Sequence, residues 1–335
     1  MSGEDSDFFK NNSSTSYEIA IPRIVRFWII LIFYIPSLIC SLFVLYYFIA
    51  SRTLRQALHN HVITLLLIVN FIVQLTSIPW IMNYYRLGHV SPQSPSFCIV
   101  WILVDEGLTI TITTLFAWAT IERHILIFHD RLIATRRRIL IFHYLPIVVV
   151  LLYCFCYSLI VIIFPPCENV FDYTQLVCGY PLCYYDQQAL AIWDVTFDHL
   201  IPIIIIISCS LGLLLRILYQ KSRMRQPARW RNYRKMTIQL LSISFLYLII
   251  YIPHMFMEFL QLVISEDIGE DVMAYLEFFV YYGNLLLPVV CAGSMPELQS
   301  KLKKLFVCCK RQARVIQPQT LTLSHRPLKT IARIY

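Results

Sequence analysis

The chain has few charged side chains. Asp, Glu, Lys and Arg make up only 14% of its 335 residues, whereas 58% of the residues are hydrophobic and the mean hydropathy is +0.63. A soluble globular protein carries about a quarter of its residues as charged side chains, because its surface faces water. The composition therefore excludes a soluble globular fold and indicates that most of the chain lies in a lipid bilayer.

Several patterns are also missing. No repeat of about 20 to 50 residues occurs, so neither a solenoid nor an inverted-repeat transporter has support from the sequence. There is no His-Glu-x-x-His, no Gly-x-Ser-x-Gly and no Cys or His spacing typical of zinc. We therefore expect no enzyme activity, no cofactor, no bound metal and no His–Asp cluster inside the membrane.

Seven apolar runs are long enough to cross a bilayer, which takes about 20 helical residues. They are Ile24 to Ala50, Asn60 to Tyr85, Phe97 to Ile121, Ile139 to Phe164, Leu190 to Tyr219, Met236 to Val263 and Val272 to Met295. They predict an all-α integral membrane bundle of seven helices at residues 24–295. Residues 1–23 form a polar tail without the apolar core of a signal peptide, so we expect the first span to direct insertion.

The distribution of cations predicts the orientation, because Lys and Arg near span ends stay in the cytoplasm. On the seven-span map, 24 of the 28 Lys and Arg fall on one side, leaving Lys10, Arg23, Arg26 and Arg86 on the other. The N-terminus is therefore predicted outside and the tail at residues 310–335 inside. This asymmetry points to anionic lipid heads and an intracellular protein as partners, and not to nucleic acid.

Cysteines and sequons follow the same map. Four cysteines fall outside, where disulfides persist: Cys98, Cys167, Cys178 and Cys183. We expect one bridge to tie Cys98 to a loop cysteine and favour Cys183, which leaves Cys167 with Cys178, although four cysteines permit three pairings. Asn11 and Asn12 begin overlapping glycosylation sequons on the outer side.

Acidic residues within the outer halves of the spans form the candidate ligand site. A charge in hydrocarbon costs about 2.5 to 3.5 kcal/mol, so each such residue is a functional hypothesis. Asp194 and Asp198 are spaced i, i+4 and should share a helix face. The full set is Asp105, Glu106, Asp194, Asp198, Glu258 and Glu277. Together they predict a cavity, open to the outside, whose field favours a cation.

Two aromatic residues join this predicted site, because an aromatic face attracts a cation. They are Tyr251 and Tyr281, and we expect Tyr281 to lie beside Asp105. Another interpretation stays open for some of the acids, namely that they are hydrated residues at span ends with local partners. It applies to Asp194, Glu258 and Glu277, with Arg86, His199 or His254 as the partners.

The inner end of the third span carries the most informative motif. Glu122-Arg123-His124 follows Cys98 by 24 residues, and prolines occur at Pro79, Pro202, Pro253 and Pro288. Over about residues 24–310 this order resembles the rhodopsin-like family of G-protein-coupled receptors, with Glu-Arg-His in place of that family's Asp-Arg-Tyr. The resemblance also covers the cysteine-bearing loop after the fourth span.

The resemblance implies a switch at the inner end. Arg123 would be held by Glu122 and Asp130 when inactive and would be released to meet a G protein, with His124 completing the motif. Pro253 and Pro288 would kink the sixth and seventh spans and so permit two arrangements of the bundle. The segments 131–138 and 219–235 would form the coupling surface.

The resemblance extends past the last span. Residues 296–309 have the apolar spacing of an amphipathic helix lying on the inner leaflet. Cys308 and Cys309 then look like palmitoylation sites.

Some positions depart from the family pattern. Asn70 stands where a carboxylate is usual, and Leu287-Pro288-Val289-Val290-Cys291 replaces Asn-Pro-x-x-Tyr. We therefore expect no sodium pocket around Asn70. No Lys occurs between Lys235 and Lys301, so the Schiff base of an opsin is excluded.

The leading hypothesis is a multi-pass plasma-membrane receptor that binds an extracellular cation, either a biogenic amine or a basic peptide, and activates a heterotrimeric G protein. A decoy receptor that binds without coupling stays open, because the seventh-span motif is altered. A seven-span channel or transporter is a weaker alternative, because the inner halves of the spans are almost uniformly apolar and offer no polar path.

Overall fold

The computed structural model describes residues 19–128, 134–180, 182–221, 227–264, 268–295 and 298–301. This part of the chain is helical or irregular and contains no strand. Residues up to Met295 form one compact unit, and the residues from Pro296 on form a second, of which 298–301 are described and helical. The predictions for Asn11, Asn12, Asp130, Cys308 and Cys309 lie outside the described residues.

The first unit consists of helices joined by short connections. The α-helices are α1 (Arg23–Ala50), α2 (Arg52–Gln56), α3 (Leu58–Leu75), α4 (Ser77–Leu87), α5 (Pro95–Phe128), α6 (Arg136–Ile139), α7 (Leu145–Ser158), α8 (Gln188–Trp193), α9 (Ile201–Lys221), α10 (Pro227–Val263) and α11 (Glu270–Ser294). Three π-helical segments, η2 (Leu140–Tyr144), η3 (Leu159–Ile163) and η6 (Asp194–Leu200), and two short 3₁₀ segments, η4 (Leu176–Gly179) and η5 (Cys183–Asp186), complete the order.

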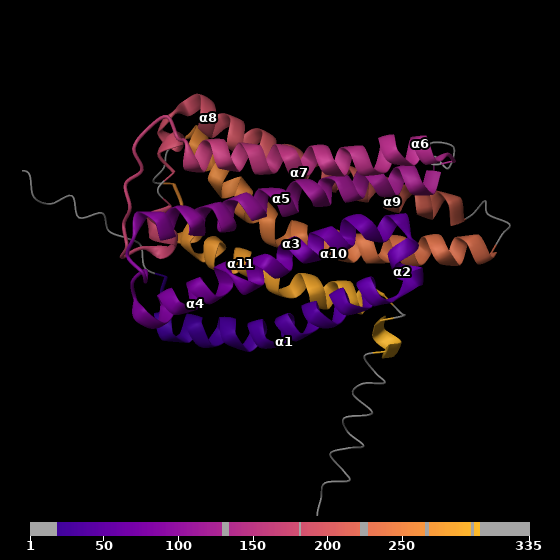
Figure 1. The fold of residues 1–335 in the computed structure, drawn as a ribbon, viewed down its shortest axis with the longest axis horizontal. Coiled ribbons are helices and arrows are strands. Elements are labelled where there is room, and N and C mark those ends of the chain that lie inside the picture. Colours follow the sequence, from indigo (N-terminus) through magenta and orange to yellow (C-terminus); the bar gives the residue numbers. More distant parts are fainter. Residues whose placement is uncertain are drawn as a thin grey trace, which may run out of the picture. The chain divides into compact units, whose positions relative to one another are not determined.

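All seven predicted spans are confirmed as helical stretches long and apolar enough to cross a membrane. Figure 1 shows the long helices side by side, with the segment between η3 and α8 at one end and α2 and α6 at the opposite end. We call these the disulfide end and the Arg123 end. The third span is longer than predicted, because its helix continues past Ile121 to Phe128 and so includes the Glu-Arg-His motif.

The helix α5 lies at the centre, in contact with α3, α7, α9 and α10. The helices α1 and α7 instead turn large apolar side chains outward, and Ile32, Ile39 and Phe155 are each more than 60% exposed. Such a surface is unfavourable in water and suited to lipid. The fold is therefore a membrane bundle whose polar side chains are gathered inside.

Three prolines of the spans lie beside breaks or irregular turns of the helices. Pro79 has no N–H to donate to the carbonyl of Leu75, and the second span breaks between α3 and α4 at Thr76. Pro146 and Pro202 each follow a π-helical segment, η2 and η6. Such segments are uncommon and gather at functional sites.

Side chains of the second span stabilise the backbone of α11 at Pro288. Pro288 leaves the carbonyl of Asn284 without its helical donor. The side-chain amides of Asn70 and Gln74 donate to that carbonyl over 3.0 and 2.9 Å. Asn70 thus stabilises the backbone of α11 beside Pro288, a role that a carboxylate could not play because it has no proton to donate.

Candidate functional site

Asp105 lies buried on α5 among hydroxyl groups. Tyr281 of α11 and Tyr180 of the loop before α8 each donate to Oδ2 over 3.3 Å, and Ser77 of α4 donates to Oδ1. The predicted proximity of Asp105 and Tyr281 is confirmed, whereas Ser77 and Tyr180 were missed. No Lys, Arg or His of the described ranges forms an ion pair with this carboxylate.

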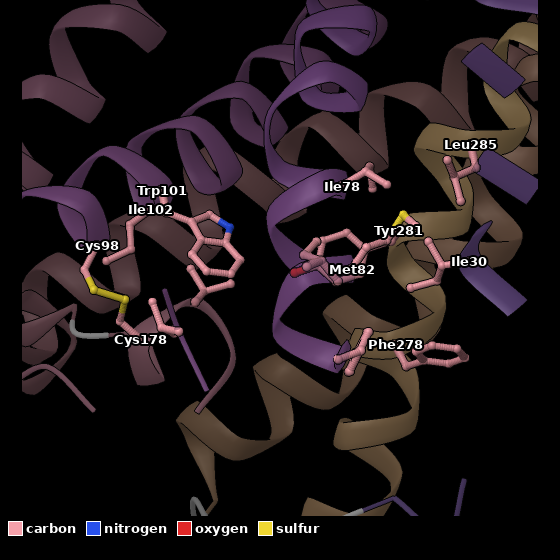
Figure 2. Packing of buried hydrophobic residues seen from close by; sticks show 14 of the residues in the cluster. Ile30, Ile78, Met82, Cys98, Trp101, Ile102, Cys178, Phe278, Tyr281 and Leu285 are labelled. Atoms are coloured by element: carbon pink, nitrogen blue, oxygen red, sulfur yellow. A yellow bond between two sulfur atoms is a disulfide. The ribbon is translucent and has the colours of Figure 1, made fainter. Parts of the chain in front are cut away.

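Tyr281 is held rigidly by apolar packing. Figure 2 shows its ring beside Met82 and Ile78 of α4, with Ile30 of α1 close by. A tightly packed aromatic ring has little rotational freedom, so its hydroxyl group is held in place toward Asp105.

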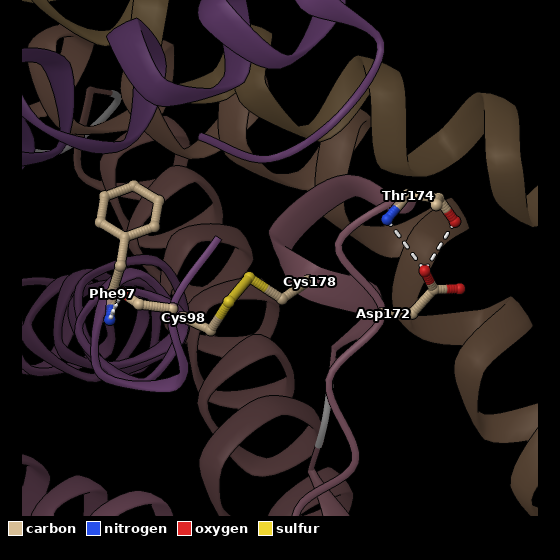
Figure 3. The surroundings of a disulfide bond; sticks show 6 residues. Phe97, Cys98, Asp172, Thr174 and Cys178 are labelled. Atoms are coloured by element: carbon tan, nitrogen blue, oxygen red, sulfur yellow. Dashed lines mark hydrogen bonds between the residues drawn. A yellow bond between two sulfur atoms is a disulfide. The ribbon is translucent and has the colours of Figure 1, made fainter. Parts of the chain in front are cut away.

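The loop that supplies Tyr180 is fastened to α5 by a disulfide between Cys98 and Cys178 (Figure 3). A second disulfide joins Cys167 to Cys183. The predicted pairing of Cys98 with Cys183 is therefore wrong. The loop turns back so that the N–H of Asp172 donates to the carbonyl of Cys178 over 3.0 Å, which holds Cys178, and not Cys183, over the start of α5.

Two loop residues have shifted ionisation. The hydroxyl and the backbone N–H of Thr174 both donate to Asp172 (Figure 3) and lower the pKa of that carboxyl. Asp172 therefore gives this loop a negative charge. Burial, and then the charge of Asp105, raise the pKa of Tyr180 well above its ordinary value. Tyr180 thus keeps its proton and can act as a donor.

A cavity of about 640 Å³ opens beside this loop. Its lining includes Tyr180, Asp172 and Glu277 together with Arg23 and Arg26. Glu277 is half-buried and has no hydrogen-bond or ion-pair partner within the described ranges, whereas Arg26 donates to the carbonyl of Ile21 over 2.8 Å. The cavity thus offers groups of both charges, and Tyr180 both lines it and contacts Asp105.

A second group of acids surrounds His199 of η6. The Nε2 atom of His199 lies 3.3 Å from Oε1 of Glu106 on α5 and 3.7 Å from Oδ2 of Asp194. The hydroxyl of Tyr185 donates to Asp194 over 2.7 Å and to Glu258 of α10 over 3.3 Å. The expectation of no intramembrane His–Asp cluster is therefore wrong.

The two predicted ligand residues not yet described, Asp198 and Tyr251, contact tyrosine side chains. Asp198 accepts a hydrogen bond of 2.8 Å from Tyr153, as Asp194 accepts one of 2.6 Å from Tyr157, so both acids face α7 as the i, i+4 spacing predicts. Tyr251 stacks on Tyr247 with ring centroids 4.1 Å apart. The eight predicted residues thus occupy several separate environments, and their binding roles stay predictions.

At the Arg123 end the predicted ion pair is absent. Glu122 accepts a hydrogen bond from His143 of η2, whose other ring nitrogen lies 3.0 Å from His61 of α3. Arg123 is 1% exposed and donates to the carbonyl of His59 over 3.3 Å, while its Nη1 has no hydrogen-bond partner in the described part of the chain. The pairing of Arg123 with Glu122 was therefore wrong, because an imidazole from the fourth span takes the carboxylate.

His124 and the prolines of the switch prediction are also placed. The ring Nε2 of His124 lies 2.6 Å from the carbonyl of Cys209 on α9. Pro253 and Pro288 lie within α10 and α11. Their roles in switching are predictions that the geometry leaves open.

A family comparison decides between the classes of membrane protein left open by composition. The model of the 7 transmembrane receptor (rhodopsin family) matches residues 41–290, or 250 of the 335 residues. The chain belongs to this family. It is a multi-pass plasma-membrane receptor, and members of the family are receptors and not enzymes. No curated protein matches the chain.

The sequence analysis named His199 as an alternative partner of Asp194, a contact that the structure shows, but it missed other residues of the receptor's polar clusters. In an α-helix, residues five apart lie about 140° apart around the axis, so Asp194 and His199 would diverge. The π-helical turn of η6 closes i to i+5 and brings them together. Ser77, Tyr180 and His143 come from other segments, and no local spacing links them to an acid.

The Glu122–His143 pair leads to a stability prediction. Replacing His143 with Leu leaves a buried carboxylate unpaired, which costs about 3–5 kcal/mol. We expect a lower thermal midpoint for the purified receptor in detergent, and partial recovery when Glu122→Gln is added. The exposed His89 provides the control His89→Leu. A midpoint for His143→Leu equal to that of the control would contradict the pairing.

Proposed function

We propose that the receptor binds an extracellular ligand bearing positive charge and then catalyses nucleotide exchange on a heterotrimeric G protein. Its N-terminus lies outside, as the cation distribution indicates. The main support is Asp105, a buried carboxylate that has three hydroxyl donors and no cation among the described residues. An unpaired charge in the bundle is costly, and a ligand cation would complete the pair.

A basic peptide fits this site better than a small amine. The cavity of about 640 Å³ extends from Tyr180 to Glu277 and Arg23, which is more than one amine needs. Glu277 would meet one positive side chain, and a second cation would reach Asp105 once Tyr180 moves aside.

The contacts of Arg123 support coupling to a G protein. Arg123 is buried and donates to the carbonyl of His59, and the neighbouring Glu122 accepts a hydrogen bond from His143. We interpret this arrangement as the inactive state. Activation would turn the guanidinium outward to the G protein, with the basic segments 131–138 and 219–235 around it.

The test is G-protein activation in cells that express the receptor, challenged with a library of biogenic amines and basic amidated peptides. We expect activation by peptides, and its loss in Arg123→Ala at unchanged surface expression. The exposed Arg52, at the same end, gives the control Arg52→Ala, which should retain the response. Binding without activation would favour the decoy alternative, and a response that persists in Arg123→Ala would contradict the role of this arginine.

A further inference from the structure

Three ligand-type atoms meet inside the bundle at a place separate from Asp105. The Glu106 carboxylate, the Asp194 carboxylate and His199 Nε2 all lie within 4.8 Å of one another. Glu106 comes from α5, whereas Asp194 and His199 come from η6. The site therefore spans two membrane helices.

One atom of this group lacks a hydrogen bond. His199 is only 4% exposed, and its Nε2 lies within ion-pair distance of both carboxylates, at 3.3 and 3.7 Å, but makes no hydrogen bond with the described residues. A buried polar atom without a partner is rare and calls for a ligand or a water. A buried nitrogen that faces two acids without a hydrogen bond is thus a second observation, independent of the acidity of the cluster.

The spacing fits a transition metal. With Zn–N and Zn–O bonds of about 2.0–2.2 Å, the ligand atoms of tetrahedral zinc lie about 3.4 Å apart. The two distances from His199 Nε2 match this value. The widest separation, at most 4.8 Å, requires the two carboxylates to approach one another by little more than 1 Å, about one side-chain torsion.

Two tyrosine hydroxyl groups hold the Asp194 carboxylate in place. Tyr157 donates to Oδ1 of Asp194 over 2.6 Å, and Tyr185 donates to Oδ2 over 2.7 Å. Ligand carboxylates in metal sites are commonly oriented by such hydrogen bonds. Tyr185 also reaches Glu258, whose Oε2 has no partner. Asp194, one of the three protein ligands, is therefore already oriented, and a water would take the fourth position of a bound metal.

Charge favours the same conclusion. Two carboxylates and a neutral imidazole around a divalent cation have no net charge, whereas without the metal the two carboxylates keep one net negative charge inside the membrane even when His199 is protonated and paired with them. An imidazole nitrogen selects zinc and related metals over Ca²⁺ and Mg²⁺, which require oxygen ligands.

We propose that Glu106, Asp194 and His199 form a zinc site within the membrane bundle. Bound Zn²⁺ would join α5 to η6 and, through Tyr185, to Glu258 of α10. It would therefore hold the third, fifth and sixth spans in one arrangement and regulate switching of the receptor. Zinc binding itself requires neither the ligand at Asp105 nor coupling to a G protein.

The test uses the full-length receptor, purified in detergent and stripped of metal with a chelator. We expect one Zn²⁺ per receptor by competition with a fluorescent indicator and a thermal midpoint that rises with Zn²⁺ but not with Ca²⁺ or Mg²⁺. Glu106→Gln, Asp194→Asn and His199→Gln should each weaken zinc binding about 10-fold or more. Failure of Zn²⁺ to bind the wild-type receptor would overturn the proposal.

Two controls match these variants. Asp198→Asn removes a carboxylate on the same segment that faces Tyr153, and His124→Gln removes an imidazole on α5 that faces Cys209. Both should retain zinc binding, and unchanged binding in His199→Gln would place the metal elsewhere. X-ray absorption of the wild-type zinc complex should report oxygen and one imidazole, without relying on any variant, and sulfur ligation would contradict the site.

Discussion

Asp105→Asn will lower the potency of the activating basic peptide by about 10- to 100-fold, the loss expected when a buried charge-assisted contact becomes neutral. The substitution keeps the shape of the side chain and an oxygen that can accept hydrogen bonds from Ser77 or Tyr281. The thermal midpoint of the unliganded receptor should remain the same or rise, because an uncompensated buried charge is removed. Dose–response curves for G-protein activation, at matched surface expression, measure the effect.

Two variants serve as controls for this result. Asp271, exposed in the first turn of α11, gives Asp271→Asn, which should leave potency unchanged. Tyr180→Phe removes a hydroxyl donor to Asp105 but keeps the charge, so potency should be retained or improved as the loop is released. Equal potency of Asp105→Asn and the wild type would remove Asp105 from the binding site.

Loss of the Cys98–Cys178 disulfide will strongly reduce the folded receptor at the cell surface. The bridge closes a sequence separation of 80 residues, for which the chain-entropy model gives about 4–5 kcal/mol. The Cys167–Cys183 bridge spans 16 residues and should contribute less, about 3 kcal/mol. Surface labelling of Cys98→Ser, Cys178→Ser and Cys167→Ser, together with their thermal midpoints, measures both effects.

Double variants test the pairing itself. Cys98→Ser combined with Cys178→Ser should be no worse than either single change, because both remove the same bond. Cys156→Ser changes an exposed, unpaired cysteine of α7 and should have no effect. If Cys98→Ser combined with Cys183→Ser were instead no worse than either single change, the pairing of Cys98 with Cys178 would be wrong.

The sequence by itself determined the class of fold. Seven apolar runs predict seven helical spans, because the hydrocarbon core has no water to bond the backbone N–H and C=O groups and a helix forms all these hydrogen bonds within one segment. Prolines such as Pro79 predict breaks for an equally local reason, the missing N–H. The proximity of Asp105 and Tyr281 was also predicted, because both residues fall in the outer halves of their spans and an aromatic face attracts the same cation as a carboxylate.

Only the tertiary structure decided which polar groups meet. Cys178 is the partner of Cys98 because the loop folds back at Asp172, and cysteine positions alone permit three pairings. Glu122 meets His143, and not Arg123, because the fourth span brings an imidazole to it. His199 meets Glu106 and Asp194 because η6 is π-helical and packs against α5. Each contact joins residues far apart in sequence or depends on a departure from regular helix, so no pattern of spacing along the chain encodes it.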